Sequence, residues 1–244
     1  MFFHIAVLIA ALVAGAIASI AGFGIGSILT PLLAVRLGTK LAVAAVSFPH
    51  IAGTLLRFSL VRRHVDRRVL VTFGITSAAG GLAGALLHTW FKSAVLGYIL
   101  GALLVFAGLS GLTGLAARMR FGRSTGLLAG ALSGVFGGLV GNQGGIRSAA
   151  LMGFDLNKEA FVATATAIAL VVDLFRMPVY IAAQWRDLLQ TWPIILFAAA
   201  GVLAGTVFGQ PLLRRIPERT FRAVVSAIIL ALGIAMLLHP GGHD

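Results

Sequence analysis

The sequence predicts an all-α, polytopic transmembrane protein with two inverted repeats, each made of a broken re-entrant helix hairpin plus three spanning helices. Three observations lead to this prediction. Of the 244 residues, 59% are hydrophobic and 11% are charged, whereas soluble domains carry about 25% charged residues. Two apolar stretches are too long for one membrane crossing and contain clustered glycines. The second half of the chain also repeats features of the first.

The apolar residues form eight segments between charged or turn-rich breaks: 5–35, 41–60, 69–87, 94–115, 126–154, 159–182, 188–209 and 221–239. Six of them have the length of one spanning helix, about 20 residues. The first and fifth would reach about 45 Å as straight helices. Each contains a glycine-rich stretch, GFGIG at 22–26 and GNQGG at 141–145. Because glycine destabilises helices and accepts left-handed angles, we expect both segments to break and turn there.

An internal repeat relates the two halves of the chain. An offset of 119 residues pairs Gly22 with Gly141, and Arg57 with Arg176. A repeat at a fixed offset indicates two copies of one structural unit. We therefore predict a first repeat at 1–115, a basic cytoplasmic linker at 116–123 and a second repeat at 124–244.

Charge predicts the orientation of the repeats. The net charge is +12, and in membrane proteins Lys and Arg report topology, so we do not expect nucleic-acid binding. The basic loops 61–68, 118–123 and 214–222 share a face only if segments 5–35 and 126–154 return to their own side. That face is then cytoplasmic and both termini lie outside. Eight full crossings remain the alternative. The start of the chain lacks a basic signal-peptide region, so we expect the first segment to be retained.

The two glycine breaks are the predicted substrate site. A half-helix that starts inside a membrane points free N–H groups and its positive dipole end at an anion. These starts are expected near Gly26 and Gly145, and inverted repeats with broken helices are typical of secondary transporters. The alternative is that the glycines only allow close packing. The predicted substrate-binding residues are Ser27, Asn142, Gln143, Arg147, Ser148, Arg57 and Arg176.

A polar stripe runs along the helix after each break. Ser47, His50, Thr54 and Arg57 share one helix face, which predicts a translocation path, because a polar face in lipid is unfavourable. Arg57 and Arg176 either touch substrate or extend to the membrane surface, and Arg176 can also pair with Asp173. Asp173 and His50 are the predicted proton carriers, being the carboxylate and the histidine that lie well inside a segment.

Other residue patterns narrow the function. Cysteine is absent, and the acids form no inward-facing pair, so an enzyme is not expected. We also expect no cofactor and no metal. His88, Tyr180 and the tryptophans fall near predicted helix ends and are expected at the membrane interface. The expected partners are a small anion and the lipid bilayer, and a homo-oligomer is one open outcome.

The chain resembles the sulfite exporter TauE/SafE family of bacterial membrane permeases. The resemblance lies in the paired glycine breaks, in Pro31 after the first break and in the Thr39-Lys40 and Asn157-Lys158 entries to the following helices. It implies an inner-membrane carrier of sulfite, sulfonates, sulfoacetate or similar organic anions. The first break has few polar groups, unlike the second.

We therefore predict a multi-pass permease of the bacterial inner membrane that moves small organic or sulfur-containing anions. The two breaks would meet near the membrane centre, and rocking of one half against the other would expose the site alternately. An anion channel and a non-transport membrane assembly protein are the alternatives.

Overall fold

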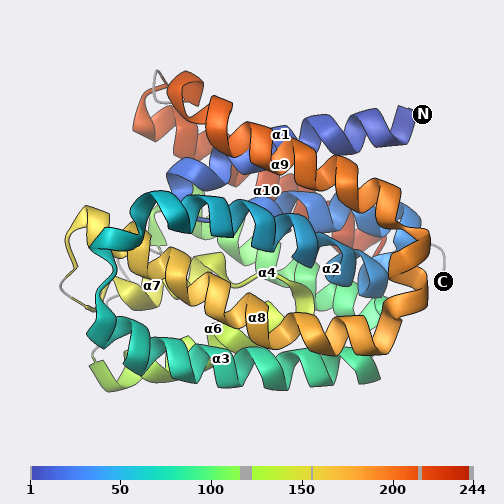
Figure 1. Cartoon of the computed structure of the whole chain (residues 1–244). Helices are drawn as coiled ribbons and strands as arrows, with labels where there is room; N and C mark the ends of the chain where they lie inside the picture. Colours follow the sequence, from blue (N-terminus) through green and yellow to red (C-terminus); the bar gives the residue numbers. More distant parts are fainter. Residues whose placement is uncertain (1, 116–122, 155, 214–215, 242–244) are drawn as a thin grey trace.

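The computed structural model describes residues 2–115, 123–154, 156–213 and 216–241. Within these ranges the chain is helical and contains no strand (Figure 1). The elements are α1 (Phe2–Ala21), α2 (Ile25–Val61), the 3₁₀ turn η1 (Arg62–His64), α3 (Arg67–Trp90), α4 (Ser93–Thr113), α6 (Arg123–Val140), α7 (Gly144–Leu151), α8 (Lys158–Gln190), α9 (Trp192–Leu213) and α10 (Glu218–Leu238).

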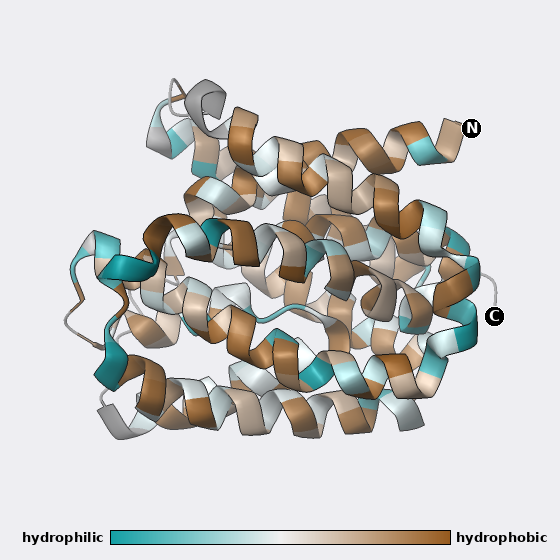
Figure 2. Cartoon of the chain, in the orientation of Figure 1, coloured by the Kyte–Doolittle hydropathy of each residue, from teal (hydrophilic) through white to brown (hydrophobic). Residues whose placement is uncertain are grey.

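Seven of the described helices are long and apolar enough to cross a membrane. Six of them correspond to the predicted spanning segments, and the seventh is α1. Apolar residues cover most of the helix surfaces between the two ends of the molecule (Figure 2). Such surfaces need a lipid solvent, and helices satisfy their own backbone groups there. The protein is therefore a multi-pass membrane protein.

Both predicted helix breaks are confirmed. The chain leaves the helical conformation at residues 22–24 and again at 141–143. Gly22 has a φ of 79° and Gly141 a φ of 73°, and L side chains rarely adopt such angles. The half-helices after the breaks start at Ile25 and Gly144, each one residue before the position expected from sequence.

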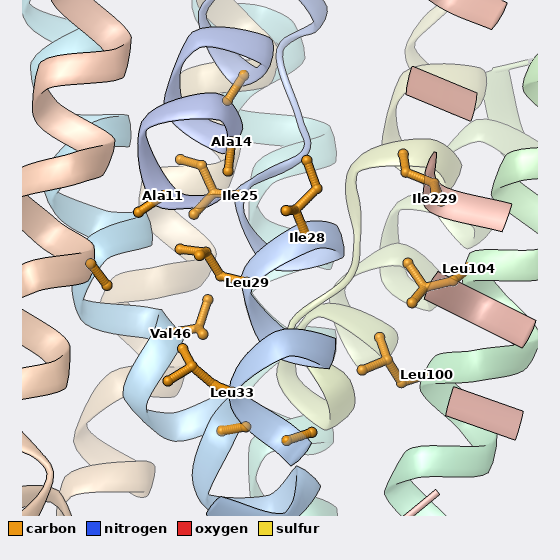
Figure 3. Packing of buried hydrophobic residues seen from close by; sticks show 14 of the residues in the cluster. Ala11, Ala14, Ile25, Ile28, Leu29, Leu33, Val46, Leu100, Leu104 and Ile229 are labelled. Atoms are coloured by element: carbon orange, nitrogen blue, oxygen red, sulfur yellow. The ribbon is translucent and has the colours of Figure 1, made fainter. Parts of the chain in front are cut away.

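The half-helix that follows the first break ends at another glycine, where α2 reverses its direction. The backbone angles are helical throughout α2 except at Gly38, where φ is 72° and ψ is 153°. A Cβ atom on Gly53 would lie 3.2 Å from the Ile25 side chain, and a straight helix would separate these residues by about 42 Å. The chain therefore folds back at Gly38. Figure 3 shows the result, with Val46 beside Leu33.

Backbone contacts interlock the two halves of the sequence. A Cβ atom on Gly205 of α9 would overlap the carbonyl oxygen of Leu12 in α1. In the same way, a Cβ atom on Gly84 of α3 would overlap the carbonyl oxygen of Val135 in α6. Small residues let membrane helices approach this closely. The first arm of each hairpin, α1 or α6, thus packs on a helix from the other half of the sequence.

The two hairpins start from opposite ends of the molecule. The Arg36 guanidinium lies 4.7 Å from the centre of the Phe3 ring, so the first hairpin begins and ends at one end. Pro240, which follows α10, lies at that end too, because its carbonyl oxygen accepts a hydrogen bond from Thr39 Oγ1 at 2.7 Å. A Cβ on Gly126 would lie 3.0 Å from the Phe154 ring, so the second hairpin closes in the same way. The inverted orientation in a membrane stays a prediction, and most of the predicted linker 116–123 lies outside the described residues.

Candidate functional site

The two helix breaks meet inside the protein. The Ser27 hydroxyl donates a hydrogen bond of 3.3 Å to Asn142 Oδ1. A Cβ atom on Gly26 would overlap the carbonyl oxygen of Gly141, so the two backbones are in direct contact. Arg147 Nη2 also approaches the carbonyl oxygen of Gly22 at 3.5 Å. Residues 115 to 125 positions apart therefore form one site.

Both half-helices point their unsatisfied N-terminal amides at this meeting point. The N-cap residues are Gly24 for α2 and Gln143 for α7, and neither makes a side-chain cap hydrogen bond. The first intrahelical bonds are donated by Ile28 and Arg147. The preceding amides of each first turn have no helical acceptor. Two positive dipole ends thus converge, which favours a negatively charged guest.

Arg147 is a buried cation without a carboxylate partner. Its relative exposure is 2%, and among the described residues its Nε and Nη1 atoms have no hydrogen-bond partner. Both polar atoms of the neighbouring Gln143 side chain are also buried and unpartnered there. Buried charges are normally paired. Nothing in the described part of the chain therefore pairs with these buried polar atoms.

Arg57 and Arg176 are both buried, so neither extends to the membrane surface. Arg57 Nη1 donates to the carbonyl oxygen of Ala18 at 2.6 Å. Arg176 Nη1 donates to the carbonyl oxygen of Gly137 at 2.5 Å. The 119-residue offset relates both donors and both acceptors, so each arginine caps the helix that ends at its break. Arg57 also lines a large cavity, whereas Arg176 lines neither described cavity.

Asp173 connects Arg176 to His50. Asp173 Oδ1 accepts a hydrogen bond from Arg176 Nε at 2.9 Å and forms an ion pair with Nη2 at 2.8 Å. Its other oxygen, Oδ2, lies 2.6 Å from His50 Nδ1. The two predicted proton carriers therefore touch, although they lie on different helices. Arg57 has Thr54 at the position equivalent to Asp173, so it lacks an equivalent ion pair.

Two residues expected at the membrane interface are in fact buried. His88 and Tyr180 have no exposed surface, so that prediction is wrong for them. His88 Nδ1 donates to the carbonyl oxygen of Leu139 at 2.8 Å, and the Tyr180 hydroxyl donates to that of Gly138. Together with Arg176 they cap three successive carbonyls at the end of α6. The spacing of Arg176 and Tyr180 on one helix face was a sequence signal for this.

A large cavity leads from the helix breaks to the end of the molecule that carries the basic loops. Its volume is about 1150 Å³. Asn142, Ser148 and Arg57 line it near the breaks, and Leu60 and Arg222 line it near the loops. The cavity wall is mostly apolar, with polar groups both at the breaks and at the outer end, where His64, Glu159 and Arg222 line it. Ser148 therefore lies on the approach to the breaks.

A second, polar pocket lies directly at the breaks. Its volume is only about 10 Å³, and its lining includes Ser27, His50, Gln143 and Arg147. Phe23 and Asn142 line both cavities and so stand between them. A space of this size holds about one water molecule. Occupation by an anion therefore requires Phe23 or the break around it to move.

Within the described ranges, no group of three or more His, Asp or Glu side chains is placed to hold a metal ion. The three buried arginines and one buried carboxylate leave a cationic surplus around the breaks. Amide, guanidinium and hydroxyl donors, which all occur here, are the groups that bind anions in proteins.

Comparison with known proteins identifies the family of the chain. No curated protein and no solved structure matches the chain. The family model described as Sulfite exporter TauE/SafE matches residues 7–236, which includes both hairpins and the helices that follow them. The members of this family are membrane transporters. The chain belongs to the sulfite exporter TauE/SafE family.

Proposed function

We propose that the protein is a secondary carrier of small organic or sulfur-containing anions in the bacterial inner membrane. The observation that carries this proposal is Arg147, a buried guanidinium beside two half-helix N-termini, with two nitrogen atoms that no described residue bonds to. An isolated buried charge is strongly unfavourable. A transported anion would neutralise it during each cycle. Sulfite, sulfonates and sulfoacetate are the candidate substrates.

In this proposal the anionic head binds between the two breaks. The amides at the start of α2 and α7, the Arg147 guanidinium and the Gln143 side chain hold its oxygens. Ser27 and Asn142 now bond to each other at 3.3 Å, and both would turn to the anion. The large cavity provides the path to the basic face, which is the cytoplasmic face by the positive-inside rule.

The moving parts are the interlocked helix pairs. Because α1 packs on α9 and α6 packs on α3 through backbone contacts, each pair would move as a unit with its own hairpin tip. At the far end, Thr39 Oγ1 donates to the carbonyl oxygen of Pro240 at 2.7 Å and Lys40 Nζ to that of Thr89 at 2.6 Å. Opening of that end would break these bonds, and closure of the large cavity would accompany it.

A closed barrier favours a carrier over a channel. The polar pocket at the breaks has a volume of only about 10 Å³, which is too small for an anion to pass unless the breaks move. In liposomes containing the purified protein, we expect saturable anion flux and accelerated exchange with anion on the other side. Ohmic single-channel currents would instead support a channel. Absence of flux with this protein alone would support an assembly role.

Thermal unfolding of the purified protein tests the site directly. The anions are sulfite, sulfate, sulfoacetate, taurine and common carboxylates in a chloride-free buffer. An anion at about 100 times its Kd should stabilise the protein by about 2.7 kcal/mol, which is about 5–11 °C for a protein of this size. Arg147→Met should abolish the shift, and the exposed control Arg68→Met should keep it. A shift that survives Arg147→Met contradicts the proposed site.

A further inference from the structure

His50 lies between the polar pocket at the breaks and Asp173, the only carboxylate that is buried among the described residues. Its Nδ1 atom lies 2.6 Å from Asp173 Oδ2. Its ring also lines the polar pocket that contains Arg147, and its side chain is 12% exposed. One side of the imidazole therefore faces a fixed charge, and the ring borders the space that the anion would enter.

The hydrogen bonds determine which nitrogen can take up a proton. Arg176 donates to Asp173 Oδ1 from Nε and pairs with it through Nη2, which holds Asp173 as a carboxylate. A carboxylate only accepts hydrogen bonds, so His50 Nδ1 must carry its hydrogen. Nε2 is then the basic nitrogen, and it has no hydrogen-bond partner among those formed by the described residues. Protonation of His50 at Nε2 would therefore add one positive charge beside the polar pocket.

The surrounding charges link this proton to the anion. Asp173 and Arg176 face His50 from α8, Arg147 shares its pocket from α7, and Arg57 lies two turns further along α2. The three arginines and Asp173 sum to +2 when His50 is neutral. A bound anion offsets this positive charge. An imidazolium at His50 in turn provides another donor and another positive charge for the anion.

We propose that His50 Nε2 takes up one proton from solution with each anion that binds, so that the protein is an anion–proton symporter. This inference rests on the proposed function. The step forms one N–H bond on binding and breaks it on release, with the proton returning to solution. Asp173 is a positioning residue that keeps its charge throughout, because Arg176 never leaves it.

Calorimetric titration in two buffers with different ionisation enthalpies measures the proton uptake. The probe is sulfate or sulfoacetate, whichever gives the larger thermal shift, since both stay fully ionised between pH 5 and 8. The wild type should take up about one proton per anion where His50 is neutral when free. In that range Kd should rise about tenfold per pH unit, by linkage. His50→Gln should bind with no proton uptake and a flat pH dependence.

Two further measurements keep the inference testable. His4→Gln, which changes a histidine that packs on Phe197 far from the site, should keep the wild-type slope. In liposomes of the wild type, an inward anion gradient should acidify the lumen, which requires no variant to fold.

The outcomes separate the two proposals. Anion binding by the wild type without proton uptake would overturn the symport inference and leave the proposed function intact. Proton uptake that persists in His50→Gln would also overturn it. Failure of every anion to bind to the wild type would overturn the proposed function and this inference with it.

Discussion

Arg147 and Arg176 should respond in opposite ways to the same substitution. Both are arginines with 2% relative exposure. Arg176 forms an ion pair with Asp173 and donates to the Gly137 carbonyl. Among the described residues, Arg147 has one hydrogen-bond contact, of 3.5 Å, and two nitrogen atoms without a partner. Methionine replaces either side chain with a neutral one of similar length.

The magnitudes follow from the charge left behind. Arg176→Met leaves Asp173 buried with His50 as its remaining partner, and breaking a buried pair costs about 3–5 kcal/mol. For a protein of this size this lowers Tm by about 6–20 °C. Arg147→Met removes a charge that has no partner. Without anions we therefore expect its stability to be unchanged or raised, by up to about 3 kcal/mol.

The assay is thermal unfolding of the purified variants in a chloride-free buffer, with and without the anion that stabilises the wild type. Arg147→Met should unfold at or above the wild-type temperature and ignore the anion. Arg176→Met should unfold well below it. Equal destabilisation by both substitutions would show that Arg147 is neutralised within the protein, and the reasoning for an anion site would then fail.

Two further predictions concern packing and capping. Gly84→Ala places a Cβ against the Val135 carbonyl and should destabilise the protein by about 1–3 kcal/mol. The control Gly145→Ala, whose Cβ meets only Ala107 at 3.9 Å, should be neutral or stabilising. Equal Tm values for the two variants would contradict the close α3–α6 packing. Tyr180→Phe removes the hydrogen bond to Gly138 and should cost about 1 kcal/mol; an unchanged Tm would mean that the α6 carbonyl is satisfied without it.

Much of the fold could be predicted because it depends on local chemistry. The apolar segments require a lipid solvent wherever they pack. Gly22 and Gly141 mark breaks because a glycine-rich stretch is a poor helix former in any context. The sequence showed a charged gap near residues 36–40 between two apolar segments. It did not identify Gly38 as the point where α2 reverses, because the reversal depends on a single positive φ.

The sequence named the residues of the candidate site but not which of them contact each other. The sequence placed His50 and Asp173 inside segments, yet nothing local indicated that they form an ion pair across two helices. His88 and Tyr180 were expected at the interface because position along a segment was the available signal. Their burial follows from α3 and α8 packing around the end of α6, whose carbonyls need donors in the absence of water.

The sequence by itself determined the solvent, the helices and the two breaks, because composition and glycine conformation act within a few residues of chain. Only the tertiary structure decided which charges neutralise each other. Arg147 and Arg176 look alike in the sequence, each within an apolar segment of one repeat. Docking of helices more than a hundred residues apart placed Asp173 against both His50 and Arg176, and no described carboxylate pairs with Arg147. Coulomb interactions act through space in a medium of low dielectric constant, so that difference exists only after the chain has folded.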